Sequence, residues 1–273
     1  MEGILLSQKY KITRLINGGS FCKLYEGIHI YKNQKVAIKC ESSELGKKIL
    51  DNEINMYMYL KKYKINIPNI KDIGIYENYK YIVMELLNIT LKEYVNKNTN
   101  METLVYYMID LMKPFHDRML VHRDIKPENF IFDTKWNLYI IDLGLSTFVS
   151  ERRMNTFIGN KLYASYNCHK SEYIYSQNDD LISIIYMLLH LYTGTLPWDK
   201  TQFDYGSKTK TKPNSESKMN YETILYGYNF HSECHSIFYN LKKNTNYEDY
   251  YKKRNKYDNH VETLIHVYND LTN

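Results

Sequence analysis

The stretch His122-Arg123-Asp124-Ile125-Lys126-Pro127-Glu128-Asn129 carries the strongest chemical signal in the chain. It follows a segment with helical spacing and places a carboxylate, a lysine and an amide at fixed offsets in one loop. In phosphoryl transfer, such a carboxylate orients the attacking hydroxyl and accepts its proton. The lysine stabilises charge on the moving group. We therefore interpret Asp124, Lys126 and Asn129 as candidate catalytic residues.

A second motif, Asp142-Leu143-Gly144, directly follows the apolar segment Leu138-Tyr139-Ile140-Ile141, which we expect to be a strand. The side chains of Asn129 and Asp142 supply the hard oxygen ligands that Mg²⁺ prefers. The order of the two motifs predicts that these residues hold Mg²⁺ against the phosphates of ATP.

Val36-Ala37-Ile38-Lys39 places a lysine on a predicted strand, from which its ammonium can reach the α- and β-phosphates of a nucleotide. Glu53 lies on the inward face of a predicted helix and is the expected partner of Lys39. Each residue alone could equally be a solvated surface charge. The sequential order Lys39, Glu53, Asp124, Asn129, Asp142 favours the functional interpretation.

The composition fits one large globular domain. The chain has 273 residues, 44% of them hydrophobic, and a net charge of +5. Charge is too evenly spread for a nucleic-acid-binding arm. Cys22, Cys40, Cys168 and Cys234 lie far apart, which argues against a zinc site or a disulfide framework and for a reducing compartment.

The chain shows no secretory signal, and its most apolar stretch, residues 181–196, contains Ser183, His190 and Thr193 and predicts a buried helix, not a membrane span. We expect an intracellular, cytoplasmic protein, with the nucleus as an alternative. The abundance of Tyr (29 residues), Asn, Lys and Ile is typical of AT-rich genomes such as those of parasites or large DNA viruses. For a viral protein, the compartment would be the host cytoplasm.

Hydrophobic periodicity predicts an α+β fold with two lobes. A small five-stranded lobe with one helix ends at residue 87, and a larger, mainly helical lobe covers residues 88–273. A ligand is expected between them. Pro114 is expected to kink or end the helix that contains it, and residues 199–219 are expected to form an exposed loop. Predicted strands cover residues 10–16, 24–30, 35–40, 70–75 and 79–86, and predicted helices cover 45–61, 90–95, 101–116 and 179–193.

These motifs together resemble those of eukaryotic-type protein kinases, from Tyr10 to Trp198, and the similarity fades beyond. Within that superfamily the chain is most similar to the casein kinase 1 group, which includes the vaccinia-related and poxviral kinases. The segments that carry this finer resemblance are Ile67-Pro68-Asn69-Ile70, Val83-Met84-Glu85-Leu86-Leu87, Tyr163-Ala164-Ser165-Tyr166-Asn167, Asp179-Asp180-Leu181-Ile182-Ser183 and Leu196-Pro197-Trp198.

The resemblance implies a single-domain, monomeric serine/threonine protein kinase that uses Mg-ATP and phosphorylates protein hydroxyls. It implies that the backbones of Glu85 and Leu87 meet the adenine edge, that Gly19 lies in the phosphate-covering hairpin, and that Asp180 braces the catalytic loop. No membrane or nucleic-acid partner is indicated. The implied adenine slot is lined by Ile16, Leu24, Ala37, Met84, Ile131 and Ile141.

Several positions depart from the family pattern. Aligned to Gly-x-Gly-x-x-Gly, the hairpin reads Asn17-Gly18-Gly19-Ser20-Phe21-Cys22, with only Gly19 in place. Leu143 replaces the usual Phe, a change that keeps the apolar contact. Asn160 replaces a Thr that bonds Asp124 and Lys126, and Asn could donate a similar bond. Leu162 and Gln177-Asn178 stand where the group has substrate-binding arginines, whereas Arg152, Arg153, Lys161 and Lys170 are nearby basic candidates.

Two other hypotheses follow. A pseudokinase that binds nucleotide or partners without turnover is motivated by the altered hairpin and by Asn160. A small-molecule kinase on the same fold is a third hypothesis, although Lys126-Pro127-Glu128-Asn129 favours protein substrates. Ser150 and Thr156 are candidates for autophosphorylation.

Overall fold

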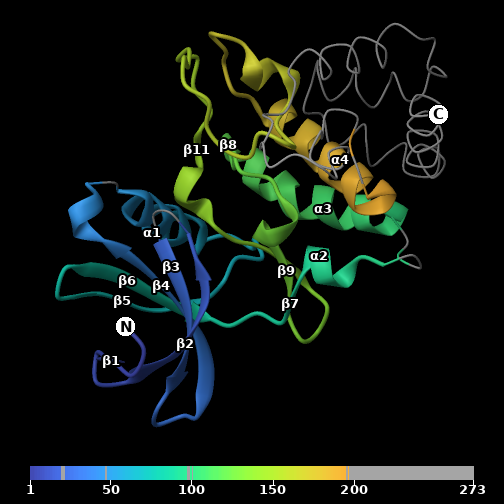
Figure 1. The fold of residues 1–273 in the computed structure, drawn as a ribbon. Helices are drawn as coiled ribbons and strands as arrows, with labels where there is room; N and C mark the ends of the chain where they lie inside the picture. Colours follow the sequence, from blue (N-terminus) through green and yellow to red (C-terminus); the bar gives the residue numbers. More distant parts are fainter. Residues whose placement is uncertain (20–21, 47, 97–98, 100, 195, 197–273) are drawn as a thin grey trace, which may run out of the picture. The chain divides into compact units, whose positions relative to one another are not determined.

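The structure is a computed structural model that describes residues 1–19, 22–46, 48–96, 99, 101–194 and 196. The chain forms two compact units, which are described separately below (Figure 1). The first unit consists of Met1–Leu91 and Glu128–Ser146, and the second of Lys92–Pro127 and Thr147–Asn273. The predicted lobe boundary at residue 87 stays a prediction.

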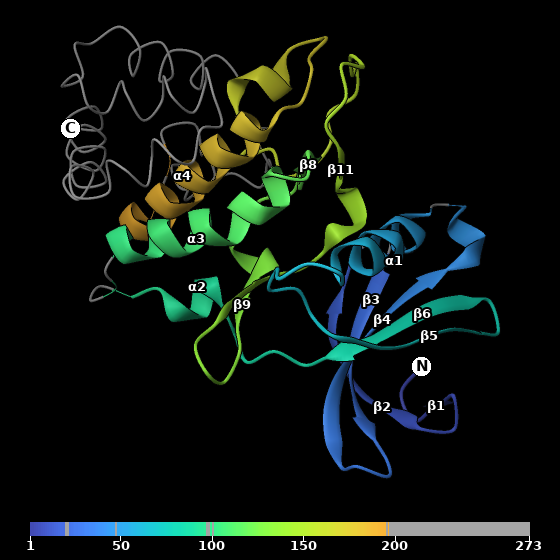
Figure 2. The ribbon, with the colours of Figure 1, turned by 180° about the vertical axis from the view of Figure 1, so that it is seen from behind.

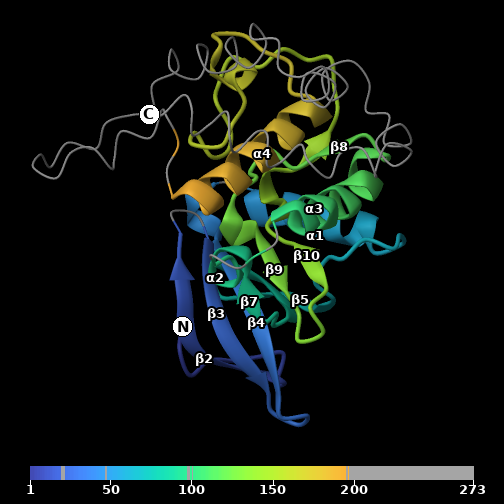
Figure 3. The same cartoon turned by 90° about the vertical axis from the view of Figure 1, so that its right-hand side faces the viewer.

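The first unit is built on an antiparallel sheet with the strand order β1-β2-β3-β4-β6-β5. Five of these strands match the predicted ones, and β2, β3 and β4 lie side by side (Figure 3). The prediction of five strands was wrong by one, because β1 is a two-residue strand and too short to show alternation. The strands are β1 (Leu5–Leu6), β2 (Tyr10–Gly18), β3 (Cys22–His29), β4 (Gln34–Ser42), β5 (Ile70–Tyr76) and β6 (Tyr79–Glu85).

The two faces of this sheet have different roles, which follow from the alternation of side chains along each strand. One face is an apolar core, formed by Leu6, Tyr10, Ile12, Tyr25, Val36, Ile38, Cys40, Tyr81 and Val83. Residues that pair directly across strands share a face, so the register Leu24↔Lys39 and Ala37↔Met84 places these four side chains together on the opposite face. These four candidate nucleotide-binding residues therefore lie on the face of the sheet opposite the apolar core.

Helix α1 (Ile49–Leu60) contacts strands β4 and β6 (Figure 1). The chain between β4 and α1 first forms a 3-10 turn, η1 (Ser43–Leu45), which ends at Gly46 in the left-handed region with φ +61°. The helix was predicted to begin at Leu45, and this was wrong because the turn and Gly46 interrupt the helical pattern. Asp51 of α1 forms an ion pair with Lys80 of β6.

The remainder of the first unit is a small antiparallel sheet with the order β10-β9-β7. Its strands are β7 (Ile89–Thr90), β9 (Phe130–Phe132) and β10 (Leu138–Ile140), and the 3-10 turns η2 (Pro127–Asn129) and η3 (Leu143–Leu145) flank them. Thr90, which is expected to cap a short helix, ends β7 by pairing with Ile131 and directly precedes the helix at Leu91–Tyr94. The hydrogen bond from Ile140 N to Asn66 O (3.0 Å) ties this sheet to the segment before β5.

The second unit contains α2 (Leu91–Tyr94), α3 (Met101–His116) and α4 (Gln177–Thr193), and α3 and α4 pack side by side (Figures 1 and 2). The predicted apolar stripe of α3 is confirmed, since Leu104, Met108, Leu111 and Phe115 are buried. Helix α3 has the predicted bounds, and Pro114 lies in its last turn, which ends at His116. A capping box of Ser176 and Asp179 begins α4.

Short pairings organise the polar loop at residues 147–160. Strand β11 (Thr147–Phe148) pairs with β8 (Leu120–Val121), and Met154 forms a bridge with Tyr173. The 3-10 turn η4 (Tyr166–His169) follows. A second apolar cluster around Val121, Ala164, Cys168, Tyr173 and Tyr175 packs beneath this loop.

Some predictions lie outside the described residues: the tip of the hairpin at Ser20 and Phe21, the segment Pro197-Trp198, the loop at 199–219 and the helices expected after residue 220. Within the described part of the chain, no helix is long and apolar enough to cross a membrane. Cys22, Cys40 and Cys168 are thiols there, as the cysteine spacing predicts.

Candidate active site

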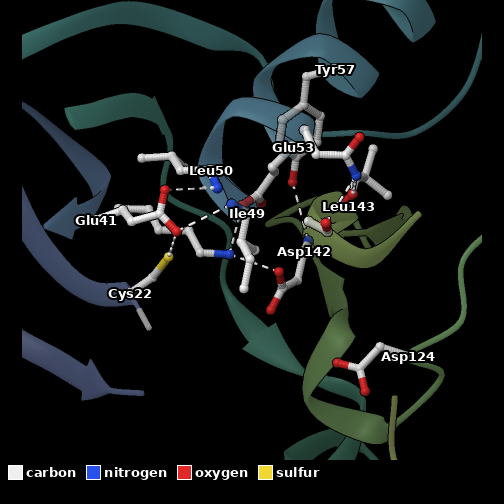
Figure 4. Close-up of polar contacts among 12 residues, drawn as sticks. Cys22, Glu41, Ile49, Leu50, Glu53, Tyr57, Asp124, Asp142 and Leu143 are labelled. Atoms are coloured by element: carbon white, nitrogen blue, oxygen red, sulfur yellow. Dashed lines mark hydrogen bonds and ion pairs between the residues drawn. The ribbon is translucent and has the colours of Figure 1, made fainter. Parts of the chain in front are cut away.

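Lys39 is the centre of a network of charges in the first unit, together with Glu53 and Asp142, which are labelled in Figure 4. Its Nζ atom lies 2.7 Å from Glu53 Oε2 on α1 and 2.7 Å from Asp142 Oδ1, which directly precedes η3. The three residues are far apart in the sequence, and the structure brings them together as the spacing argument requires. Asp142 adopts the left-handed region with φ +60°, a backbone conformation that is uncommon for residues other than glycine.

Burial determines the electrostatics of this network. Burial alone would lower the pKa of Lys39, but the charges of Glu53 and Asp142 outweigh it and raise the pKa above its ordinary value. Lys39 therefore remains a cation. The side chain of Glu53 is only 1% exposed, and this burial raises its pKa although Lys39 opposes the shift. The Asp142 side chain is 35% exposed and is thus the member of the group that solvent reaches most easily.

Two residues of α1 that the sequence reasoning missed hold the segment at Asp142. Asn52 Nδ2 donates hydrogen bonds to the carbonyl oxygens of Gly144 and Ser146, both at 2.9 Å. The Tyr57 hydroxyl accepts a hydrogen bond from Asp142 N at 3.2 Å. Tyr57 lies one helical turn after Glu53, and this spacing is the one signal that could have identified it.

Replacing Tyr57 with phenylalanine removes this hydroxyl and leaves the partly buried N–H of Asp142 without its acceptor. We expect a loss of about 1–3 kcal/mol in the free energy of unfolding, which is the cost of a buried unsatisfied group. We also expect that more Mg²⁺ is needed for ATP to raise the melting temperature. Urea unfolding and thermal shift measure the two effects. The control is Tyr25→Phe on the other face of the sheet, and equal Mg²⁺ dependence in both variants would contradict the assignment.

Asn129 lies next to the Asp142 segment. Its carbonyl oxygen accepts a hydrogen bond from Ile141 N at 2.9 Å, and the residue is 3% exposed. An amide and a carboxylate are a suitable donor set for Mg²⁺, which is commonly bound by one or two protein oxygens together with phosphates and water. In keeping with such a small set, the described residues contain no cluster of three or more His, Cys, Asp or Glu side chains placed to hold a metal ion.

The residues implied for the adenine slot all belong to the first unit. Ala37 and Met84 pair across β4 and β6 and are nearly buried, whereas Ile16 on β2 is 41% exposed. Leu24, Ile131, Ile141 and Leu87 are partly exposed. The N–H of Glu85 donates to Asn69 O (3.0 Å) and is therefore already used within the first unit.

The hairpin between β2 and β3 closes through a hydrogen bond from Gly19 N to Cys22 O at 3.0 Å. Cys22 thus begins a strand. Burial raises the pKa of its thiol to about 12, although Lys39 nearby lowers it. A thiol that stays protonated is a poor nucleophile, so Cys22 is expected to be a chemically inert small side chain and not a reactive cysteine.

The catalytic-loop candidates Asp124 and Lys126 belong to the second unit, and Lys126 Nζ lies 2.5 Å from Asp124 Oδ2. The expected brace is confirmed. Asp180 of α4 accepts hydrogen bonds from the backbone N–H groups of His122 (2.7 Å) and Arg123 (3.0 Å). It also accepts one from the Tyr175 hydroxyl and is bonded to His116 Nε2 (3.1 Å). One fully buried carboxylate thus fixes the backbone before Asp124.

Asp180→Asn should destabilise the second unit by about 3 kcal/mol, because an amide nitrogen cannot accept the bonds that one carboxylate oxygen accepts. Burial would raise the pKa of Asp180, but the bonds and charges of His116 and His122 hold it below its ordinary value. The carboxylate therefore stabilises the fold above its unfolded pKa of about 3.9, and this stabilisation is lost as the pH falls through the lower folded pKa. Urea unfolding should show a smaller loss of stability on acidification in the variant, and parallel profiles would contradict this.

Gly159 makes a close approach to the catalytic loop. Its φ is +99°, and a Cβ atom at this position would lie 1.8 Å from the carbonyl oxygen of Arg123. The neighbouring Asn160 does not make the bond suggested for it. Its side-chain oxygen accepts from Leu162 N (2.9 Å) and Tyr163 N (3.4 Å), and no bond from Asn160 to Asp124 or Lys126 occurs in the described structure. The side-chain oxygen of Asn160 therefore caps the turn of its own loop.

A pocket of about 380 Å³ lies in the second unit beside the catalytic loop. It brings together Arg152 and Arg153, which were basic candidates, with both candidate phosphorylation sites, whereas Lys161 and Lys170 are not part of its wall. Arg153 also pairs with Glu172 at 3.0 Å. The polar and charged residues of the lining are Arg123, Thr147, Ser150, Arg152, Arg153, Asn155, Thr156 and Tyr175.

Comparison with known families agrees with this geometry. The family model described as the protein kinase domain matches residues 10–253. The match continues beyond Trp198, where the resemblance was expected to fade, and it covers most of the second unit. The matched region includes Lys39, Glu53, Asp124, Asn129 and Asp142. The chain therefore belongs to the protein kinase domain family.

Proposed function

We propose that the protein is an active serine/threonine protein kinase that transfers the γ-phosphate of ATP to hydroxyl groups of proteins. The observation that carries this proposal is the pairing of Lys39 with both Glu53 and Asp142, each at 2.7 Å. A lysine held in this way is positioned for the phosphates of a nucleotide. The chain also has the acidic and amide residues that phosphoryl transfer needs, namely Asp124, Asn129 and Asp142.

Each residue has a separate role in this proposal. Lys39 binds the α- and β-phosphates, and Glu53 holds its ammonium in place. Asn129 and Asp142 would hold Mg²⁺, which when bound neutralises developing charge on the phosphates.

Asp124 orients the substrate hydroxyl and accepts its proton, while Lys126 stabilises the transferred group. The apolar side chains of Ala37 and Met84 contact the adenine.

The serine/threonine specificity and the casein kinase 1 assignment rest on sequence. Lys126-Pro127-Glu128-Asn129 is the serine/threonine form of the catalytic loop, and Tyr163-Ala164-Ser165-Tyr166-Asn167 is typical of the group. We propose a monomer that acts on proteins inside the cell. The arginines at the pocket beside the catalytic loop are the candidate contacts for acidic substrates, in place of the arginines that the group has at Leu162 and Gln177-Asn178.

Transfer of labelled phosphate from ATP to casein, or to the protein itself, tests the activity. Phosphoamino-acid analysis of the product tests the specificity, and phosphotyrosine as the main product would refute it. Asp124→Asn is the inactive control. Comparing phosphorylated proteins in native cells that contain the active protein or Asp124→Asn would then identify substrates.

The second candidate function is a pseudokinase that binds nucleotide or partners without turnover. One observation favours it: Asn160, which replaces the threonine expected to support Asp124, bonds to its own loop instead. Stabilisation by Mg-ATP in a thermal-shift experiment, together with no turnover on a broad panel of proteins and metabolites, would select this function. Turnover of metabolites alone would select the small-molecule kinase.

A further inference from the structure

Glu41 is a buried carboxylate that the roles described above do not use. It lies on β4 two residues after Lys39, so both side chains are on the same face of the sheet. Glutamate is seldom buried without partners, yet Glu41 is only 4% exposed. Its environment therefore needs a physical explanation.

The explanation lies at the first turn of α1 (Figure 4). Glu41 Oε1 accepts a hydrogen bond from Ile49 N, and Oε2 accepts one from Leu50 N, both at 3.2 Å. These N–H groups begin the helix and have no partner within it. The residue at the N-cap position, Lys48, makes no capping bond with its side chain. A carboxylate from a neighbouring strand thus caps the helix, where negative charge is also favoured by the helix dipole.

This cap acts beside the Lys39–Glu53 pair. Glu41 and Lys39 are on one strand, and Ile49 and Glu53 are one turn apart on one helix. The strand and the helix are consequently joined at two successive points: Glu41 at the first turn of α1, and Lys39 at Glu53 one turn later. The contact at the first turn fixes the position and rotation of the helix, and thereby the position of Glu53. The further strand–helix pair, Asp51–Lys80, is more than one-third exposed at each side chain, and pairs of this kind hold geometry weakly.

A third contact brings the hairpin to the same carboxylate. Cys22 pairs with Glu41 across β3 and β4, and its thiol points toward Glu41 Oε1 at a distance of 4.0 Å. Because burial keeps this thiol protonated, it can act as a weak donor. Glu41 therefore contacts the end of the phosphate-covering hairpin as well as the start of α1.

We propose that Glu41 is a positioning residue that holds α1 in the orientation in which Glu53 meets Lys39. The role in catalysis rests on the proposed kinase function, whereas the effect on the Lys39–Glu53 pair does not. Substitution of Glu41 should therefore loosen the pair whether or not the protein turns over ATP. This separation allows the two proposals to fail independently.

The primary experiment measures how fast a small amine-acylating reagent labels Lys39 in the folded protein. The label is detected by mass spectrometry of the peptide that contains Lys39. Glu53→Gln defines the rate when the pair is broken. We expect Glu41→Gln to raise the rate toward that value, and amide hydrogen exchange at Ile49 and Leu50 to become faster. The matched control is Glu26→Gln, which removes another buried carboxylate of the same sheet, one that pairs with Arg14 and Lys35. This control should leave the labelling of Lys39 unchanged.

Activity provides the second measurement. Glu41→Gln should lower kcat/KM for ATP by about 10-fold, since misplacing an aligned group can cost up to about 10²-fold. The loss should largely disappear when Glu53→Gln is already present, because both changes act on one pair. Unchanged Lys39 labelling in Glu41→Gln, or an increase equal to that in Glu26→Gln, would overturn the positioning role. Absence of turnover in the wild-type protein would instead refute the kinase proposal. The rate of Lys39 labelling would then still test whether Glu41 holds the Lys39–Glu53 pair.

Discussion

Lys39→Met is expected to lower the rate of phosphoryl transfer by about 10²–10³-fold, which is typical for loss of one preorganised electrostatic contact to a reacting group. Methionine has a similar length but removes the ammonium that Glu53 and Asp142 both contact at 2.7 Å. The two carboxylates are then left without their shared cation. The measurement is transfer of labelled phosphate from ATP to casein under saturating Mg²⁺.

The same strand supplies the control for this experiment. Lys35 also lies on β4, but its side chain is 68% exposed and pairs with Glu26 at 2.9 Å. Lys35→Met should retain nearly full activity and stability, because exposed ion pairs contribute little. Asp142→Asn should be as inactive as Lys39→Met, since an amide is a weaker ligand for Mg²⁺ and carries no charge. Activity that survives both Lys39→Met and Asp142→Asn would refute the roles assigned here.

Gly159→Ala is expected to abolish activity and to destabilise the second unit by about 3 kcal/mol or more, which combines backbone strain with steric overpacking. The added methyl carbon would lie 1.8 Å from the carbonyl oxygen of Arg123, so one of the two backbones must move. Arg123 directly precedes Asp124, and its own backbone is held by Asp180. The displacement therefore reaches the proposed catalytic carboxylate.

A second glycine separates the two causes of this effect. Gly194 ends α4 with φ +80°, but a Cβ atom there would have no neighbour within 4 Å. Gly194→Ala should cost only about 1 kcal/mol, from the left-handed backbone alone, and should retain activity. Urea unfolding and casein phosphorylation of both variants provide the comparison. Equal effects of the two substitutions would show that the approach to Arg123 is unimportant.

Sequence patterns were sufficient for most of the large sheet of the first unit and for helix α1. The alternation of apolar residues identified five of the six strands of its large sheet, and helical spacing identified α1 to within one turn. These signals are local, because side-chain direction repeats along a single strand or helix. Strand β1 and the start of α1 were missed, since a two-residue strand and a 3-10 turn are too short to show a period.

The chemical types and order of Lys39, Glu53, Asp124, Asn129 and Asp142 were likewise readable from the chain, because Glu53 lies on one face of a predicted helix and each of the others lies in a short motif. The supporting residues were not readable. Asn52, Tyr57 and Glu41 belong to no motif, and their roles arise from contacts to backbone groups on other elements. Such contacts are directional and depend on how two elements pack, which no local pattern encodes.

The sequence by itself identified the candidate residues for phosphoryl transfer and the elements on which they lie. Only the tertiary structure decided how those residues are held: α1 capped by Glu41, the segment at Asp142 bonded to Asn52 and Tyr57, and the loop at Gly159 pressed against Arg123. The physical reason is the separation along the chain of the residues that interact. A motif is set by neighbours along the chain, whereas the position of a helix against a sheet is set by hydrogen bonds and packing between residues distant in sequence.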